Sequence, residues 1–439
     1  MQKLESKIKR REFKMAVVGL GYVGLPLLLL LHKLGFTSIG IDKNKEKIAQ
    51  LKSGELKFLR NDQTAKKLLK KYLMNNKFGI SADFRQIKET DIIFVSVDTP
   101  IDKRKQPDNA NISQVSKNIA KHLKKNAIVV IESTLAPKTT HNVIIPIIEK
   151  TANLRVNQDF YVAVCSERIR PNQDVFRDLD EFPRIIGTSS NSINSLVQSV
   201  YKLITKGEID VVDIVTAEIV KTAENALRDV KIAFSNEICQ ICDELGSNAW
   251  QVTELVNKRY GYDEMLQPGI GVGGHCLPKD PWLLLSQTKH LKSSLIKEAR
   301  RANSYMPLYT AKLIKEKLMK NGIKYKNAKV LILGYSYIEN CEDTRNSPSI
   351  DLIKNLKKTG LKKVSVHDPN VSEYNDDLYE KAKGADCLIL AVKHDLFKNL
   401  NLLRIKKIMR TPLIFDCKNF FGKEKCQNLG FIYHALGAI

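Results

Sequence analysis

Residues 15–42 read MAVVGLGYVGLPLLLLLHKLGFTSIGID. The apolar run 15–20 predicts a short buried strand, residues 25–34 predict a helix, and residues 38–41 predict a second strand that ends at Asp42. A GxGxxG turn joins the first strand to the helix. Such a turn alone is a weak signal, but strand, glycine turn, helix, strand and terminal acid within about 30 residues form a dinucleotide-binding pattern.

The spacing of the glycines has a physical basis. Gly19 permits the tight turn, Gly21 lets a pyrophosphate approach the backbone, and Gly24 lets the helix pack closely on the strand. The N-terminus of the helix then favours the negatively charged phosphates. Asp42 can accept hydrogen bonds from both ribose hydroxyls and would repel a 2′-phosphate. The pattern therefore predicts NAD, rather than NADP, as the cofactor.

A signal peptide or membrane anchor is the alternative for the same region. Residues 1–14 are basic and residues 15–31 carry no charged side chain, as in the two regions of a signal peptide. The uncharged stretch is 17 residues long, at the lower limit for a membrane span, and Pro26 and three glycines interrupt it. Asp42 and the glycine spacing favour a cytoplasmic NAD-binding protein, whereas an anchor predicts fractionation with membranes.

The composition is that of an ordinary soluble globular protein. The 439 residues are 43% hydrophobic and 27% charged, and this length predicts two to four domains of about 100–200 residues each. Eight cysteines are too few for a disulfide scaffold, so we expect a reducing compartment. The net charge is +23, but the lysines are spread along the chain, which favours a lysine-rich surface over a nucleic-acid patch. A basic NAD-binding module that binds nucleic acid stays a remote alternative, and it predicts steeply salt-dependent binding.

Further strand patterns extend the first domain. Continuous apolar runs at 91–97, 127–131 and 161–164 predict parallel strands that are buried on both faces. Alternation of these runs with helical patterns indicates a doubly wound sheet. We expect a basic extension at 1–12, followed by an NAD-binding Rossmann domain at 13–207.

The pattern changes after the first domain. Apolar residues at a 3.6-residue period predict one long helix at 217–245, and a second helix is expected at 296–321. The apolar positions of the first helix are 219, 223, 226, 227, 230, 234, 238, 241 and 245. We assign 208–322 to a central helical domain, because long central helices commonly connect two α/β halves and form oligomer interfaces.

The remaining residues, 323–439, predict a second and smaller parallel sheet without a full GxGxxG turn. The expected strands are 329–333, 363–367, 387–392 and 413–416. The fold class is therefore α/β, with two Rossmann-like doubly wound parallel-sheet domains joined by a long central helix.

The most unusual segment is 267–280, QPGIGVGGHCLPKD. Four glycines within 269–274 make a loop whose backbone amides can approach a ligand closely. The loop leads to Cys276, with Lys279 and Asp280 just after it, and nearby cations favour a nucleophilic thiolate. We therefore expect Cys276 to be reactive. Buried and inert thiols are expected in apolar helix or strand contexts, at Cys239, Cys387 and Cys417.

Other polar residues leave two interpretations open. Lys221 and Asn225 are four residues apart and so share one face of the long helix, as solvated surface or as part of a site. Cys239 and Cys242 form a CxxC inside the same helix, but without a second ligand pair they predict no zinc site. Polar residues also follow three expected strands, at the edge where sheet enzymes place their sites: Thr99, Ser133, Thr134, Glu167 and Arg168.

Taken in chain order, these segments resemble the UDP-sugar (nucleotide-sugar) 6-dehydrogenase family, from about residue 13 to the C-terminus. The similar segments are VVGLGYVGLPL (17–27), VSVDTP (95–100) with PD (107–108), EST (132–134), SER (166–168), TAEIVKTAENALRDVKIAFSNE (216–237), QPGIGVGGHCLPKDPW (267–282) and EDTRNSPS (342–349). The SER and GGHC segments are more similar to the UDP-N-acetylmannosamine and UDP-N-acetylglucosamine branch than to UDP-glucose dehydrogenase.

The resemblance implies a two-step, four-electron oxidation of the sugar C6 hydroxyl to a carboxylate with two NAD. Cys276 would hold the intermediate aldehyde as a thiohemiacetal and then as a thioester, which prevents its escape. Lys221 and Asn225 would stabilise oxyanions and Asp280 would activate or orient water. Glu167 and Thr134 would assist proton transfer and water placement.

The resemblance also implies two sets of contacts. The expected NAD contacts are Gly19, Gly21, Tyr22, Val23, Gly24, Asp42, Lys47, Thr99, Thr134, Lys279 and Arg345. The expected substrate contacts are Glu167, Arg168, Lys221, Asn225, Arg259, Gln267, Gly269, Gly273, Tyr337 and Lys418. Arg259 would reach the substrate of a neighbouring subunit, and the implied assembly is a homodimer or a higher homo-oligomer formed through the central helix. The implied role is in polysaccharide biosynthesis.

This chain departs from the family pattern at three places. Ser166 replaces the usual Pro, Asn172 replaces the Gly that follows Pro171, and Ile338 replaces a Lys that would contact the substrate pyrophosphate. The residues implied in chemistry are intact, so an active enzyme is expected. UDP-N-acetylmannosamine is the first candidate substrate, and UDP-glucose and UDP-N-acetylglucosamine are the alternatives.

Overall fold

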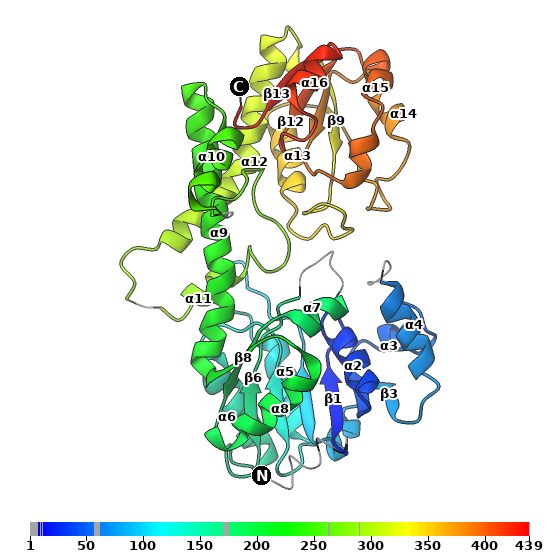
Figure 1. Cartoon of the computed structure of the whole chain (residues 1–439), viewed down its shortest axis with the longest axis vertical. Coiled ribbons are helices and arrows are strands. Elements are labelled where there is room, and N and C mark those ends of the chain that lie inside the picture. The colour runs from blue at the N-terminus through cyan, green and yellow to red at the C-terminus, as the bar shows by residue number, and fades with distance from the viewer. Residues whose placement is uncertain are drawn as a thin grey trace. The chain divides into compact units, whose positions relative to one another are not determined.

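The chain folds into two compact units, Met1–Ala223 with Trp282–Lys289, and Glu224–Pro281 with His290–Ile439 (Figure 1). The computed structural model describes residues 8, 10, 12–56, 62–169, 175–261, 264–288 and 290–438. The finer division into an extension and three domains remains a prediction.

The first unit contains an eight-stranded sheet in the order β3-β2-β1-β4-β5-β6-β7-β8. Neighbouring strands are parallel except for β6 and β7, which pair antiparallel. The strands are β1 (Lys14–Val18), β2 (Thr37–Ile41), β3 (Phe78–Ser81), β4 (Ile92–Val95), β5 (Ile128–Ile131), β6 (Tyr161–Val164), β7 (Arg184–Thr188) and β8 (Ile209–Asp213). The first six follow the strand order of a dinucleotide-binding fold, with the switch point between β1 and β4.

Helices connect these strands and cover the sheet on both faces. They are α2 (Gly24–Lys33), α3 (Lys45–Lys52), α4 (Gln63–Tyr72), η1 (Phe84–Glu89), α5 (Ala110–Ala120), η2 (Thr140–Ile144), α6 (Ile145–Ala152), α7 (Val175–Glu181), η3 (Asn191–Ile193) and α8 (Asn194–Ile204). Met15 and Val17 of β1 pack into one core, and Ala16 and Val18 pack into the other. This is why the parallel strands are continuously apolar rather than alternating.

Residues 15–31 form β1, the glycine turn and most of α2, so the single anchor helix of the alternative interpretation is wrong. A ten-residue α2 is far shorter than a bilayer requires. Among the helices of the described ranges, none has the length and apolar composition needed to span a membrane.

The second unit contains a parallel five-stranded sheet in the order β10-β9-β11-β12-β13. Its strands are β9 (Lys329–Leu333), β10 (Lys363–His367), β11 (Cys387–Leu390), β12 (Leu413–Asp416) and β13 (Ile432–Ala435). Its other elements are α10 (Ala249–Tyr260), α11 (Asp280–Leu285, shared with the first unit), α12 (Leu295–Lys320), η4 (Tyr325–Asn327), α13 (Pro348–Lys358), α14 (Leu378–Ala382), η5 (Asp395–Asn399), α15 (Leu402–Ile408) and α16 (Lys423–Asn428). The predicted α/β class with two Rossmann-like sheets is confirmed, and the antiparallel pair β6–β7 is the one departure from the predicted parallel order among the described strands.

The second sheet repeats the turn geometry of the first without its full glycine pattern. The N–H of Gly334 donates to the carbonyl of His367, as the N–H of Gly19 donates to that of Ile41. Both glycines have positive φ, 95° and 94°. In each unit an aspartate follows the second strand and accepts a backbone N–H from the turn, which pins the glycine turn to the sheet edge.

The long helix α9 (Ile214–Leu245) is the longest of the described helices and continues from the first unit into the second (Figure 1). Its predicted apolar period is only partly buried within one chain. Five apolar side chains are exposed by 41% to 77%, and together they are called the α9 strip: Ile219, Leu227, Phe234, Ile241 and Leu245. The strip shows that α9 presents apolar surface which its own chain does not cover.

Candidate functional site

The glycine turn after β1 has the close contacts that its sequence predicts. A Cβ at Gly19 would lie 2.0 Å from the carbonyl oxygen of Ser96, and a Cβ at Gly24 would lie 1.8 Å from the carbonyl oxygen of Gly19. At Gly21, by contrast, no described atom lies within 4 Å of such a Cβ. The turn is therefore packed where structure requires glycine and open where a pyrophosphate would approach the N-terminus of α2.

Asp42 stands at the end of β2 and is largely buried. Its Oδ2 accepts hydrogen bonds from the Leu20 N–H (3.0 Å) and from Lys47 Nζ (2.8 Å), and its Oδ1 accepts one from the Asn44 N–H (2.9 Å). Burial opposes ionisation, but these hydrogen bonds outweigh it, so the pKa of Asp42 lies below its ordinary value. An ionised carboxylate is thereby held beside the glycine turn, where it fits a ribose with free hydroxyls.

Residues that follow β4 and β5 meet at the same sheet edge. The Thr99 hydroxyl donates to the carbonyl of Thr134 (2.6 Å), and the Ser133 hydroxyl donates to that of Val97 (2.7 Å). Thr99 and Thr134 are both largely buried. The structure thus brings together two predicted cofactor contacts, although their roles remain predictions.

The segment after β6 carries Glu167 and Arg168. The Glu167 N–H donates to the carbonyl of Glu132 (3.2 Å), and its Oε2 accepts the N–H of Ile169 (2.7 Å). Arg168 donates to the carbonyl of Pro183 (3.0 Å). Glu167 is therefore anchored to the end of β5. Pro171 and the altered Asn172 lie outside the described residues.

In the second unit, Cys276 lies on the turn that begins α11. Its carbonyl accepts the N–H groups of Lys279 (3.0 Å) and Asp280 (2.8 Å). All eight cysteines are described and none forms a disulfide, and the other seven are buried whereas Cys276 is partly exposed. The thiol that the sequence predicts to be reactive is therefore the accessible one.

Two residues predicted from the resemblance are hydrogen-bonded to each other beside this turn. Asn225 Nδ2 of α9 donates to Asp280 Oδ2 (2.6 Å), and Lys279 Nζ lies 3.5 Å from Asp280 Oδ1. Asp280 is fully buried. Lys221 precedes Asn225 by one turn of α9 and is half-buried, and its role in a site remains a prediction.

The glycine-rich loop is fitted against α9 and α12. The Gly269 N–H donates to Asn236 Oδ1 (2.9 Å). A Cβ at Gly271 would lie 2.8 Å from the carbonyl oxygen of Asn303. That carbonyl has no helical donor because Pro307, four residues later in α12, lacks an N–H. The proline thus leaves the Asn303 carbonyl without its helical partner where Gly271 packs against it.

The other part of this loop contains two further glycines and packs against Tyr337 and Lys418, two of the predicted substrate residues. A Cβ at Gly273 would lie 2.7 Å from the carbonyl oxygen of Asn346, and one at Gly274 would lie 2.7 Å from the ring of Tyr337. A Cβ at Gly269 would lie 2.7 Å from Lys418 Nζ. Burial lowers the pKa of Lys418 and raises that of Tyr337. The structure therefore brings together four of the predicted substrate residues.

Other predicted residues lie beside this cluster or at the surface. Arg345 forms an ion pair with Asp343 (2.7 Å), although its carbonyl accepts the N–H of Gly274 (3.0 Å). Gln267 and Arg259 are exposed, and Arg259 lies in the last turn of α10. Tyr22 of the glycine turn is 44% exposed. Within the described residues, no group of three His, Cys, Asp or Glu side chains could hold a metal ion.

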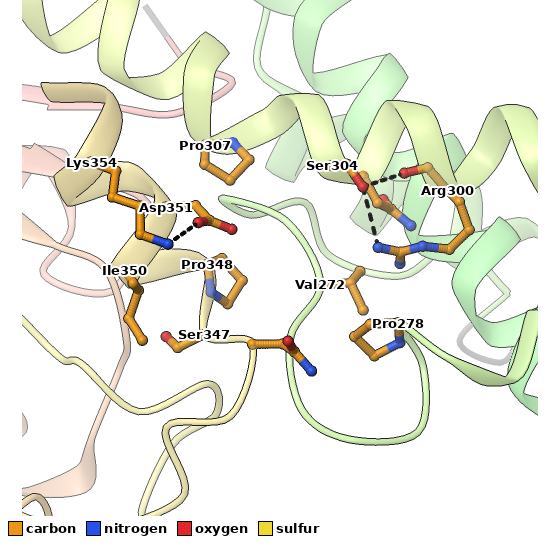
Figure 2. A pocket seen from close by; sticks show the side chains of 12 residues that line it. Val272, Pro278, Arg300, Ser304, Pro307, Ser347, Pro348, Ile350, Asp351 and Lys354 are labelled. Carbon is orange, nitrogen blue, oxygen red and sulfur yellow. Dashed lines mark hydrogen bonds and ion pairs between the residues drawn. The ribbon is translucent and has the colours of Figure 1, made fainter. Parts of the chain in front are cut away.

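A cavity of about 350 Å³ lies beside the glycine-rich loop (Figure 2). The loop lines it with Val272 and Pro278, and α12 lines it with Arg300, Asn303, Ser304 and Pro307. The wall is completed by Asn346, Ser347, Pro348, Ile350, Asp351 and Lys354. None of the residues predicted to contact substrate lines this cavity, so it lies next to their cluster and not within it.

Sequence patterns missed the network that supports the loop. Arg300 Nη1 pairs with Asp229 Oδ1 (2.5 Å), and Asn303 Nδ2 donates to the same oxygen (2.9 Å). Asn236 Nδ2 donates to Asn303 Oδ1 (2.9 Å), which links the network to Gly269. The available signal was polar residues on two helices. It can be interpreted only when the packing of one helix against the other is known.

Comparison with known proteins covers nearly the whole chain. The NAD-binding, central and UDP-binding domain models of the UDP-glucose/GDP-mannose dehydrogenase family match residues 13–205, 215–305 and 331–423. The chain is 35% identical to UDP-N-acetyl-D-mannosamine dehydrogenase of Pyrococcus horikoshii, over 97% of this chain and 99% of the relative. It is 32% identical to UDP-N-acetyl-D-glucosamine 6-dehydrogenase of Pseudomonas aeruginosa, over 94% of this chain and 99% of the relative.

Solved structures give the same picture. The structure of UDP-D-ManNAc dehydrogenase from Pyrococcus horikoshii has a TM-score of 0.91 at 35% identity, and covers 97% of this chain and 99% of that one. An NDP-N-acetyl-D-galactosaminuronic acid dehydrogenase from Methanosarcina mazei has a TM-score of 0.84 at 30% identity, over 100% of this chain and 98% of that one. The similarity therefore extends to fold and sequence together.

Proposed function

The chain belongs to the UDP-glucose/GDP-mannose dehydrogenase family, and from this membership we propose that it oxidises the C6 hydroxyl of UDP-N-acetyl-D-mannosamine to a carboxylate. It is an NAD-dependent nucleotide-sugar dehydrogenase. The observation that carries the proposal is the partly exposed Cys276 on a turn whose next residues include the buried Asp280, bonded to Asn225.

NAD fits the first unit on the evidence of its own residues. The space at Gly21 leaves room for the pyrophosphate at the N-terminus of α2, and Asp42 is ionised at the end of β2. Thr99 and Thr134 stand at the neighbouring strand ends. Bound NAD would accept one hydride in each of the two oxidation steps.

Cys276 would carry the covalent part of the reaction. Loss of a hydride and a proton from the C6 alcohol leaves an aldehyde, to which the Cys276 thiolate adds to form a thiohemiacetal. Loss of a second hydride and a proton gives a thioester. Water then attacks the thioester carbonyl, the C–S bond breaks, and the uronate and the thiol are released. A covalent link holds the aldehyde in place between the two oxidations.

The surrounding polar groups would stabilise the negative charge that develops on oxygen during the reaction. The ammonium of Lys221 would stabilise the oxyanions, and Asn225, oriented by its hydrogen bond to Asp280, would donate beside it. Asp280 would orient the attacking water, and Glu167 and Thr134 would assist its placement and proton transfer.

Substrate contacts are proposed for the cluster of Gly269, Gly273, Tyr337 and Lys418, which the second unit holds together. Relatives named for UDP-N-acetyl-D-mannosamine support that substrate. UDP-N-acetyl-D-glucosamine is the second candidate, because a relative of similar coverage is named for it. UDP-glucose is the third.

We further propose a homodimer or higher homo-oligomer assembled through α9. The α9 strip supports this, since its five apolar side chains are uncovered in the single chain. Arg259 is exposed on α10 and would reach a neighbouring subunit's substrate. The family also supports a cytoplasmic reaction that supplies polysaccharide biosynthesis.

The test is NADH formation at 340 nm with the three UDP-sugars in parallel. We expect the highest kcat/KM for UDP-N-acetyl-D-mannosamine. In the same assay Cys276→Ala should form no uronate. Its matched control is Cys417→Ala, because Cys417 is a fully buried thiol. A higher kcat/KM for another of the three sugars would replace the proposed substrate. Absence of NADH with all three would refute the proposed activity.

A further inference from the structure

Four ionisable side chains are buried together beneath the segment that carries Glu167. Glu132 follows β5, Cys165 follows β6, Arg184 begins β7 and Tyr201 lies on α8. Their exposed fractions are 3%, 0%, 1% and 1%. They are called the Glu132 cluster, and they share the sheet edge at which Thr134 stands.

The contacts within the cluster centre on the carboxyl of Glu132. The hydroxyl of Tyr201 donates a short hydrogen bond to Glu132 Oε1 and also interacts with Cys165. The positive charge of Arg184 attracts the carboxylate of Glu132. Arg184 itself donates to the carbonyl of Leu179 (3.3 Å), and its Nε has no hydrogen-bond partner among the described residues. The buried guanidinium of Arg184 therefore lacks a full set of hydrogen bonds within the described part of the chain.

The cluster is linked to the proposed catalytic groups in two ways. The backbone carbonyl of Glu132 accepts the N–H of Glu167 (3.2 Å), and Thr134 is only two residues further along the chain. The carboxyls of Glu132 and Glu167 also repel each other when both are ionised. A change of charge at Glu132 therefore changes the electrostatic potential at Glu167, because the region around Glu132 is poorly solvated.

We propose, on the basis of the proposed function, that Glu132 is a positioning residue whose charge sets the orientation of Glu167 during thioester hydrolysis. When Glu132 is ionised it neutralises Arg184, and Glu167 stays directed at the attacking water. When Glu132 is protonated, Arg184 is left to attract Glu167 away from that task.

The protonation state of Glu132 changes in the range where the enzyme is assayed. Burial raises the pKa of Glu132 to about 7, against the attraction of Arg184 and the hydrogen bond from Tyr201, while the charge of Glu167 adds to the rise. Arg184, Tyr201, Cys165 and Glu167 are the charged or titratable groups that face it from β7, α8 and the segment after β6. We therefore expect kcat to increase as the pH rises through 7.

The experiment compares the pH dependence of kcat in wild type, Glu132→Gln and Glu218→Gln at saturating substrate. Glu218 is a matched control because it is also a buried acid of the first unit, bonded to Thr140, with its pKa raised by burial. We expect Glu132→Gln to lose the rise between pH 6 and 8 and to fall about tenfold in kcat at pH 8. The KM values for NAD and for the UDP-sugar should change little. Glu218→Gln should keep the pH profile of wild-type kcat.

A second variant covers the case in which Glu132→Gln does not fold. Tyr201→Phe removes a hydrogen bond that favours ionised Glu132, so the rise in kcat should move to higher pH. A Glu132→Gln profile that matches wild type, or an unmoved Tyr201→Phe profile, would overturn the positioning role alone. A wild type that turns over no UDP-sugar would overturn the proposed function, and the positioning role with it.

Discussion

Two glycines of the dinucleotide turn differ in what a methyl group would meet. Gly24→Ala would place a Cβ against the carbonyl of Gly19, and we expect it to lower the free energy of unfolding by about 3 kcal/mol. Gly21→Ala meets no described atom, so its stability should match wild type. Its NAD affinity should nevertheless fall by tenfold or more, about 1.4 kcal/mol, because the methyl group occupies the approach to the pyrophosphate.

Thermal unfolding and NAD titration of the two variants separate these effects. Equal NAD affinity of wild type and Gly21→Ala would contradict the position assigned to the pyrophosphate. The free energy of unfolding of Gly24→Ala tests only the packing of Gly24 against the carbonyl of Gly19.

Glu132 also makes a prediction about stability. Its pKa is 4.5 in an unfolded chain and about 7 when buried, so the folded state binds the proton more tightly. The resulting stabilisation is complete below pH 4.5 and is lost as the pH rises to 7. The difference between a pKa of 4.5 and one of about 7 corresponds to about 3 kcal/mol.

Urea unfolding at pH 5 and pH 7.5 measures this contribution of Glu132 to the free energy of unfolding. The free energy of unfolding of wild type should fall more between the two pH values than that of Glu132→Gln. Equal falls in the two proteins would show that Glu132 is ionised at ordinary pH.

Individual site residues were predictable where their chemistry depends on local sequence. The spacing alone predicts close backbone contacts at Gly19, at Gly24 and in the loop before Cys276, and an open approach at Gly21. The pairing of Asn225 with Asp280 was not predictable from spacing, since 55 residues separate them. The Glu132 cluster was missed for the same reason, because its four members come from four separate elements.

At the scale of elements, most strands were predicted, whereas β3, β7, β8 and β13 were not. The strands at 161–164, 329–333, 363–367 and 413–416 match their predicted bounds. β3 and β8 were missed because their side chains are only partly buried, as in Phe78–Ser81 and Ile209–Asp213. A half-buried strand has no long apolar run, so its sequence resembles a loop.

The α9 strip makes a prediction at the same scale. Phe234→Asp places a charge in the middle of an exposed apolar row, so it should dissociate the oligomer and leave the fold intact. Met74→Asp is the matched control, because Met74 is an exposed apolar residue outside the strip. Light scattering with size-exclusion chromatography gives the mass of each protein. A wild-type monomer, or an unchanged mass for Phe234→Asp, would contradict the role of the strip.

At the scale of the whole molecule, the charge of +23 bears on the encounter with anionic ligands. A positive surface field raises the association rate of a UDP-sugar, and salt screens this field beyond about 10 Å at 0.1 M. We expect kcat/KM to fall several-fold as the salt concentration rises from about 20 to 300 mM, while kcat at saturation stays nearly constant. A kcat/KM that is independent of salt would show that the lysines only coat the surface.

The central claim is that Cys276 links the two oxidations covalently. The most direct measurement is the amount of NADH and uronate formed from a limiting amount of UDP-N-acetyl-D-mannosamine, with wild type and Cys276→Ala. Wild type should form two NADH per sugar and one uronate, and Cys276→Ala should form no uronate. Two NADH and one uronate from Cys276→Ala would contradict the covalent role of this thiol.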